Sequence, residues 1–99
     1  MTINVVATLT VRPGSGPALE AAVAEARKDV MNEPGCVRYD LQRKFRSETD
    51  YIMLETWESV ADLKTHGQAP AFVAFSAKAA DILAAAPEVL VYEPVGEQV

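Results

Sequence analysis

The chain is 99 residues long, has a formal net charge of −5, and draws 49% of its residues from the hydrophobic set. This length fits a single domain over residues 1–99. The acidic balance argues against a nucleic-acid binder. Charges also interrupt every apolar stretch before it reaches the ~18 residues of a membrane span.

The apolar content is high for so short a chain, because a domain of this size buries only roughly 60–65% of its unfolded surface. Either the interior is unusually dry, or part of the apolar surface contacts a partner. The lone cysteine, Cys36, cannot form an internal disulfide, and no basic region precedes the first apolar run. Both features favour a cytoplasmic protein.

The first half of the chain predicts a strand, a helix and a second strand. Branched residues over 3–11 indicate a strand, which ends in a loop of turn-forming residues. Pro17 suits the first turn of a helix that continues at helical spacing to Val30. The second strand, over 36–45, is expected at a sheet edge. Its predicted apolar side consists of Val37, Tyr39, Leu41 and Phe45.

The second half begins with a polar hairpin loop over 46–50 and a strand over 51–57, neither face of which is clearly directed to solvent. Ser59 resembles the first residue of a capping box, which predicts a short helix ending near His66. A longer helix follows Pro70, and a short strand over 89–95 precedes a polar tail. The expected apolar stripe of the longer helix consists of Phe72, Val73, Phe75, Ala79, Ile82 and Leu83.

This order of elements is that of the split βαβ, or ferredoxin-like, α+β fold. Right-handed crossovers place the helices on one face of a four-stranded antiparallel sheet, with the first and third strands central. Both faces of the first and third strands carry apolar side chains, including Ile3, Val5, Ala7, Leu9, Ile52 and Leu54, and no element of the chain covers the face without helices. We therefore expect a homodimer in which two sheets pack face to face.

The sequence contains no recognisable signature for a nucleotide, flavin, haem or metal site. Gly14-Ser15-Gly16 has Leu19 where a dinucleotide fingerprint needs its third glycine, and one histidine with one cysteine is too small a set for a metal. An enzyme built on this chain is therefore expected to work without a cofactor.

Three candidates for chemistry lie in the third strand and the short helix that follows it. His66, the only histidine, is the natural general base near neutral pH, although a lone histidine at a helix end is more often a cap or a surface residue. Trp57 either belongs to the core or walls a pocket with its indole N–H. Glu55 lies in a central strand, where burial requires a proton or a partner. Pairing with Arg38 or Arg43 is the structural alternative.

Four more residues are candidates for the same site. Asn4 is unusual within a strand and either forms a hydrogen bond at the sheet edge or serves the site. Tyr39 either packs in the core or presents its hydroxyl to a pocket. Phe72 and Phe75 either belong to the core or wall a ligand cavity.

Four segments in this order resemble the antibiotic biosynthesis monooxygenase (ABM) domain family, and most closely its small stand-alone quinol monooxygenase-like branch. They are Glu33-Pro34-Gly35-Cys36-Val37-Arg38-Tyr39, Glu55-Thr56-Trp57-Glu58-Ser59, Leu63-Lys64-Thr65-His66 and Pro70-Ala71-Phe72. The resemblance implies a dimeric α+β barrel with a pocket between the sheet and the helices of each subunit. It also implies cofactor-free oxidation of phenols, hydroquinones or anthrone-type compounds by O2.

The resemblance makes Asn4, Trp57 and His66 the candidate catalytic residues, with Tyr39, Glu55 and Phe72 near or behind them. The chain departs from the family pattern at Ala71, where a histidine is frequent. A proton relay from His66 would then run through Glu55, Tyr39 or water.

Three alternatives remain open. Haem-degrading relatives place a tryptophan on the short helix and a histidine on the long one, where this chain has His66 and approximately Ser76, which disfavours haem degradation. Isomerases that process autoinducers share the general pattern but would need an anion site. A non-catalytic ligand-binding or structural dimer is the third alternative.

Overall fold

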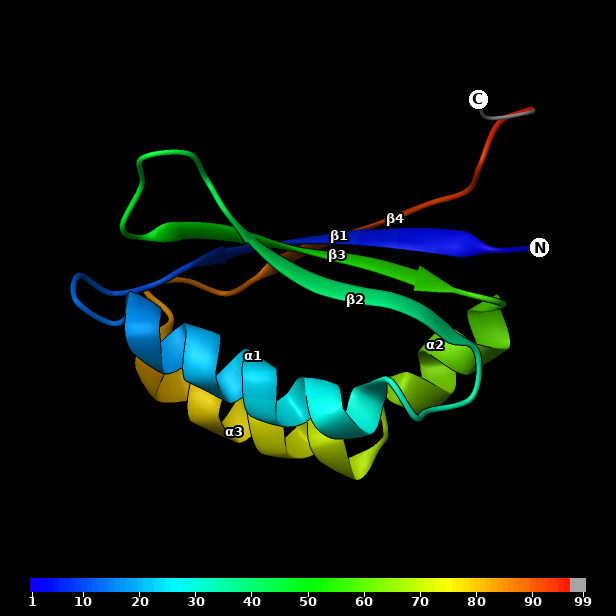
Figure 1. Cartoon of the computed structure of the whole chain (residues 1–99), viewed down its shortest axis with the longest axis horizontal. Helices are drawn as coiled ribbons and strands as arrows, with labels where there is room; N and C mark the ends of the chain where they lie inside the picture. The colour runs from blue at the N-terminus through cyan, green and yellow to red at the C-terminus, as the bar shows by residue number, and fades with distance from the viewer. Residues whose placement is uncertain (97–99) are drawn as a thin grey trace.

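The computed structural model describes residues 1–96, and its elements follow the predicted order (Figure 1). The four strands form an antiparallel sheet in the order β2-β3-β1-β4, so the first and third strands are central, as predicted. All helices lie on one side of this sheet, which confirms the ferredoxin-like α+β fold. The elements are β1 (Ile3–Thr10), α1 (Gly16–Val30), β2 (Cys36–Arg43), β3 (Asp50–Trp57), α2 (Val60–His66), α3 (Pro70–Ile82) and β4 (Glu88–Tyr92).

The two central strands divide their side chains strictly between the two faces of the sheet. Alternate residues of β1, beginning with Ile3, are buried against the helices, and so are alternate residues of β3, from Tyr51 to Trp57. Helix α1 completes this core with the apolar stripe that its spacing predicts, from Leu19 to Val30. The faces of β3, which the sequence left undecided, are therefore distinct: the one carrying Glu55 is covered.

The predicted apolar side of β2 is only partly correct. Val37 is 52% exposed because a bulge between Cys36 and Arg38 leaves it outside the regular ladder. Phe45 is 85% exposed because β2 ends at Arg43, before the hairpin loop.

Two further sequence predictions need correction. Phe72 and Val73 are exposed rather than part of a buried stripe, because α3 covers the sheet along a narrow line on which only Ala79 is fully buried. Strand β4 ends at Tyr92 rather than at residue 95, and Pro94 lacks the N–H that a longer ladder requires. Most of the predicted polar tail, residues 97–99, lies outside the described residues.

Within residues 1–96, no helix or strand lies over the face of the sheet away from the helices (Figure 1). Val6, Ile52 and Leu54 are half-buried there, and Leu90 and Tyr92 of β4 are exposed beside them. We refer to these five residues as the open-face patch. Among residues 1–96, no helix is long and apolar enough to cross a membrane.

Candidate active site

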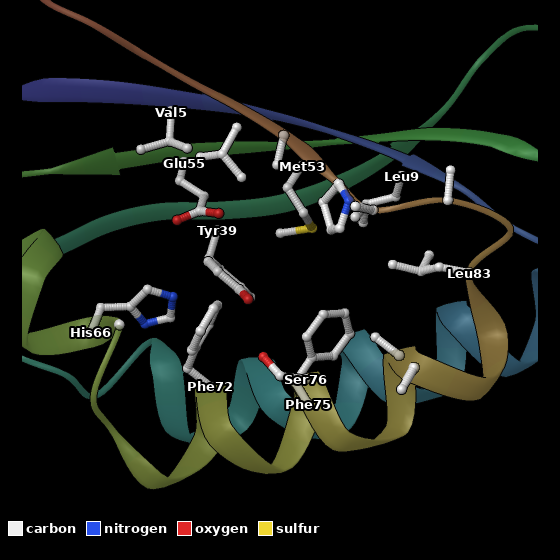
Figure 2. A pocket seen from close by; sticks show the side chains of 18 of the residues that line it. Val5, Leu9, Tyr39, Met53, Glu55, His66, Phe72, Phe75, Ser76 and Leu83 are labelled. Atoms are coloured by element: carbon white, nitrogen blue, oxygen red, sulfur yellow. The ribbon is translucent and has the colours of Figure 1, made fainter.

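A pocket of about 620 Å³ lies between the helix-covered face of the sheet and the helices α2 and α3. This volume is within the range of roughly 300–1,000 Å³ that is usual for small-molecule sites. Its walls are mainly apolar, with Met53 on the sheet side and Phe75 on the helix side (Figure 2). The polar side chains of Glu55 and His66 gather at one end, while Leu83 lies at the other.

His66 is the last residue of α2, and only 4% of its surface is exposed. The helix is fixed at its start by Ser59, whose hydroxyl accepts a hydrogen bond from the backbone N–H of Asp62. At its end, Nδ1 of His66 lies 2.7 Å from Oε1 of Glu33. An ionised carboxylate can only accept a hydrogen bond, so this contact places the proton of a neutral imidazole on Nδ1. Nε2 is then the nitrogen left for a ligand.

Aromatic rings hold the imidazole of His66 on three sides. The indole of Trp57 is tilted by 32° against it, with ring centroids 4.6 Å apart. The rings of Tyr39 and Phe72 meet it edge-on, at 5.6 and 5.3 Å. These contacts come from β2, β3 and α3, so the orientation of the imidazole is determined by packing as well as by its hydrogen bond.

Glu55 is 8% exposed, and its Oε1 accepts a hydrogen bond of 3.0 Å from Nε1 of Trp57. Burial raises the pKa of the Glu55 carboxyl above its ordinary value, and Glu33 adds to the rise, while Trp57 and His66 oppose it. The structural alternative of an arginine partner is not observed, because Arg38 binds Asp40 and Arg43 binds Glu20.

Tyr39 is buried, and its hydroxyl points into the cavity (Figure 2). Burial raises the pKa of this phenol well above its ordinary value, and the nearby Glu55 and Glu33 act in the same direction. Tyr39 therefore remains neutral around pH 7 and is available as a hydrogen-bond donor.

Five of the seven predicted site residues line the pocket: Tyr39, Glu55, His66, Phe72 and Phe75. Phe72 is 36% exposed and Phe75 is half-buried, so they wall the cavity rather than fill the core.

The other two candidates lie elsewhere. Trp57 is 0% exposed and lies behind His66, with its N–H already donated to Glu55. Asn4 is on the opposite face of the sheet, where its Oδ1 accepts a 2.7 Å hydrogen bond from Oγ1 of Thr56. The two-residue repeat of β1 separates Asn4 from the pocket, since its neighbours Ile3 and Val5 face the helices.

Sequence reasoning did not single out Glu33 as a site residue, because it lies 33 residues before His66 and in a loop. It also did not assign to the pocket several residues whose spacing carries the necessary signal. Leu9 and Met53 share the strand faces of Val5 and Glu55, and Ser76 lies one helical turn after Phe72.

The side chains of the pocket do not match a metal or haem site. No cluster of three or more potential metal ligands occurs among the described residues. Helix α3 carries no histidine, and Ser76 lines the pocket from it. The imidazole of His66, on α2, is enclosed between Glu33 and Trp57. The residues present therefore do not reproduce the long-helix histidine expected of a haem-degrading site.

Comparison with known families gives a match to the antibiotic biosynthesis monooxygenase model over residues 2–78. This match covers most of the chain and agrees with its fold and its pocket. The chain therefore belongs to the antibiotic biosynthesis monooxygenase family.

Among curated proteins, the chain is 34% identical to the "Putative monooxygenase YcnE" of Bacillus subtilis, over 72% of this chain and 78% of that one. It is 30% identical to the "Heme oxygenase (mycobilin-producing)" of Mycobacterium tuberculosis, over 88% of this chain and 83% of the relative. An uncharacterized Synechocystis protein, sll1783, is 32% identical over 63% of this chain, and the match spans 42% of that longer protein.

Among solved structures, a "putative antibiotic biosynthesis monooxygenase" from Caulobacter crescentus CB15 superposes with a TM-score of 0.89. The two chains are 35% identical, and the match covers 96% of this chain and 91% of the other. This agreement extends the family likeness to the whole fold.

Proposed function

We propose that the protein is a cofactor-independent monooxygenase that uses O2 to oxidise a small electron-rich aromatic compound of the quinol, phenol or anthrone type. The observation that carries the proposal is the position of His66 at the polar end of an apolar pocket. Glu33 engages Nδ1 of the imidazole, which leaves Nε2 to take a proton from a hydroxyl group of the substrate.

Removal of that proton gives a phenolate, which is electron-rich enough to pass one electron to O2. The resulting radical pair combines to form a carbon–oxygen bond, and the peroxide then loses water to leave a quinone. For a phenol with a free ring position, phenol plus O2 gives quinone plus water. The substrate supplies all the electrons, and no separate reductant is consumed.

The remaining residues of the polar end have supporting roles in this scheme. Tyr39 is a donor for the oxygen that carries the developing charge, and Glu55, whose raised pKa favours the protonated form, is a second. Trp57 holds the Glu55 carboxyl and supports the imidazole. Phe72 and Phe75 contact the aromatic ring of the substrate and keep water from the reacting atoms. Asn4 has no part in this scheme, because it lies on the other face of the sheet.

The proposal includes a cytoplasmic homodimer formed through the open-face patch. A sheet face with so many apolar side chains rarely remains uncovered in a monomer. A second sheet packed on this face gives the α+β barrel that the family resemblance implies.

Oxygen uptake with reduced quinones, phenols and anthrones tests the function. We expect consumption above the rate of autoxidation, and a loss of about 10²–10⁴-fold in the variant His66→Ala. Val73→Ala, on the exposed side of α3, is the matched control and retains activity. If no compound of this class is consumed faster than it autoxidises, the proposal is wrong, and ligand binding without turnover would favour the non-catalytic dimer.

The isomerase alternative has less support. A phosphorylated substrate needs cationic partners, and no lysine or arginine lines the pocket formed by the described residues. Product formation without O2 would nevertheless favour an isomerase over a monooxygenase.

A further inference from the structure

We propose that Glu33 is a positioning residue that fixes His66 in the tautomer able to act as a base. The inference rests on the proposed function for its catalytic meaning, while the Glu33–His66 geometry is a feature of the fold itself. Glu33 lies in the loop between α1 and β2, outside the lining of the pocket. It therefore acts through the imidazole and does not touch the substrate.

The Glu33–His66 contact is short and shielded from water. The Nδ1–Oε1 distance is 2.7 Å, and the exposed fractions of the two side chains are 4% for His66 and 15% for Glu33. A hydrogen bond to a carboxylate is stronger than a neutral one, and it strengthens further where the surroundings exclude water. The contact is therefore strong enough to select one tautomer.

The loop that carries Glu33 is attached to the segment that carries His66. The carbonyl of Gly35 accepts a 2.8 Å hydrogen bond from the backbone N–H of Glu58, just before α2. Gly35 has a φ of +77°, and the Asp62 side chain occupies the space that a Cβ on Gly35 would need. A residue with a side chain would fit neither this backbone conformation nor this contact. The turn and the helix thus keep the Glu33 carboxylate and the His66 imidazole in contact.

The chemistry requires this tautomer. With the proton on Nδ1, Nε2 carries the free lone pair and can accept a proton from a phenolic hydroxyl in the pocket that His66 lines. When it does so, the imidazolium that forms is stabilised by the adjacent Glu33 carboxylate, as in other base–orienter pairs. With the proton on Nε2 instead, the same ring is a donor and cannot begin the reaction.

The chain has a single histidine, which makes the tautomer directly measurable. In ¹⁵N-labelled protein, the imidazole nitrogens give one set of NMR signals, and their shifts and long-range couplings distinguish Nδ1–H from Nε2–H. We expect the Nδ1–H form in the native protein. In Glu33→Gln, whose amide can also donate, we expect Nε2–H signals to appear, together with a fall in kcat of about 10²-fold and little change in KM.

Glu25→Gln is the matched control, since Glu25 is an exposed carboxylate of α1 that pairs with the exposed Lys28. It should keep the native tautomer and the native kcat. Glu33→Asp retains a carboxylate, and it should restore the Nδ1–H form and part of the kcat.

The inference is overturned if Glu33→Gln keeps the Nδ1–H signals of the native protein. A purely structural role would lower the melting temperature of Glu33→Gln without moving the tautomer. The NMR measurement needs no substrate, so it decides the role of Glu33 even if no aromatic compound is oxidised. Failure of the oxygen assay alone would refute the proposed reaction and leave the tautomer result intact.

Discussion

The two faces of the sheet are formed by the same strands, but one buries polar groups and the other exposes apolar side chains. On the helix-covered face, Glu55 and His66 are buried, and each polar atom there has found a partner or points into the pocket. On the open face, Val6 and Leu54 remain half-buried, and none of the described helices lies over them. The covered face therefore buries two ionisable side chains, which is unusual for a small core. The open face exposes more apolar surface than a monomer usually does.

The two faces differ in what they require from outside the chain. The covered face is completed within the chain, because Glu33 and Trp57 supply the partners that the ionisable groups require. The open face has its Asn4–Thr56 hydrogen bond but no comparable cover for its apolar side chains. We therefore expect substitutions on the covered face to change chemistry and local stability. Substitutions on the open face should change association.

The largest effect is expected from a charge in the centre of the open-face patch. In Leu54→Asp, the new carboxylate would be buried without a partner in a sheet-to-sheet dimer, which costs several kcal/mol in each subunit. Light scattering after size exclusion should show the mass of two chains for the native protein and of one chain for the variant.

Val73→Asp is the control for this prediction, because it places the same charge on the exposed outer side of α3. It should remain dimeric. A native protein that runs with the mass of one chain would contradict the dimer, and with it this account of the open face.

The division between the faces was partly predictable from the sequence. The order of elements correctly predicted the fold, and the helical spacing from Leu19 to Val30 predicted the stripe that α1 buries. The two-residue alternation of β1 also places Asn4 and Val5 on opposite faces of the sheet, but the family resemblance placed Asn4 in the site. Periodicity is reliable here because it depends on the geometry of a single strand.

Contacts between distant segments were not predictable in the same way. Nothing in the local pattern indicates that Glu33 reaches His66, since a loop carboxylate is usually solvated. The exposure of Val37 has a similar cause: a bulge depends on the register with β3, which a single strand does not encode. The site therefore emerged in outline from the sequence, while its hydrogen-bonded partners required the fold.

The second effect concerns the turn that joins the loop of Glu33 to α2. In Gly35→Ala, the new methyl group would overlap the Asp62 side chain at a φ of +77°, so both contact and backbone are strained. Gly14→Ala is a matched control, because Gly14 has a φ of +83° but nothing within 4 Å of the new methyl group.

Urea unfolding should show a loss of about 1–2 kcal/mol for Gly14→Ala from the backbone alone. The loss for Gly35→Ala should be clearly larger. Equal losses in the two variants would mean that the Gly35–Asp62 contact does not hold the covered face together.

The third effect concerns pH and the buried carboxyl of Glu55. Its pKa is raised in the folded protein, above the 4.5 of an ordinary glutamate, chiefly by burial. At pH values between the ordinary pKa and the raised pKa, Glu55 loses its proton in the unfolded chain and keeps it in the folded protein. The free energy of unfolding therefore falls as the pH rises through this range. Each unit of difference corresponds to about 1.4 kcal/mol.

Glu55→Gln keeps the acceptor for Trp57 but cannot ionise. The free energy of unfolding of the native protein, relative to this variant, should decline from about pH 4.5 upward and level off once folded Glu55 is ionised. Denaturant titrations at several pH values measure the difference. A difference that stays constant with pH, or rises, would contradict a raised pKa in the folded state.

The smallest effect is expected at Asn4, on the open face. Asn4→Ala removes the 2.7 Å hydrogen bond from Thr56, which is half-buried, and should cost about 1 kcal/mol of stability. The pocket lies on the other side of the sheet, so oxygen consumption per folded dimer should stay within about 2-fold of the native rate.

Thr56→Val removes the same hydrogen bond from the other partner and should reproduce the loss of stability. If Asn4→Ala instead abolishes oxygen consumption while Thr56→Val does not, the two faces of the sheet are not chemically independent. The site would then extend through the sheet to the dimer interface.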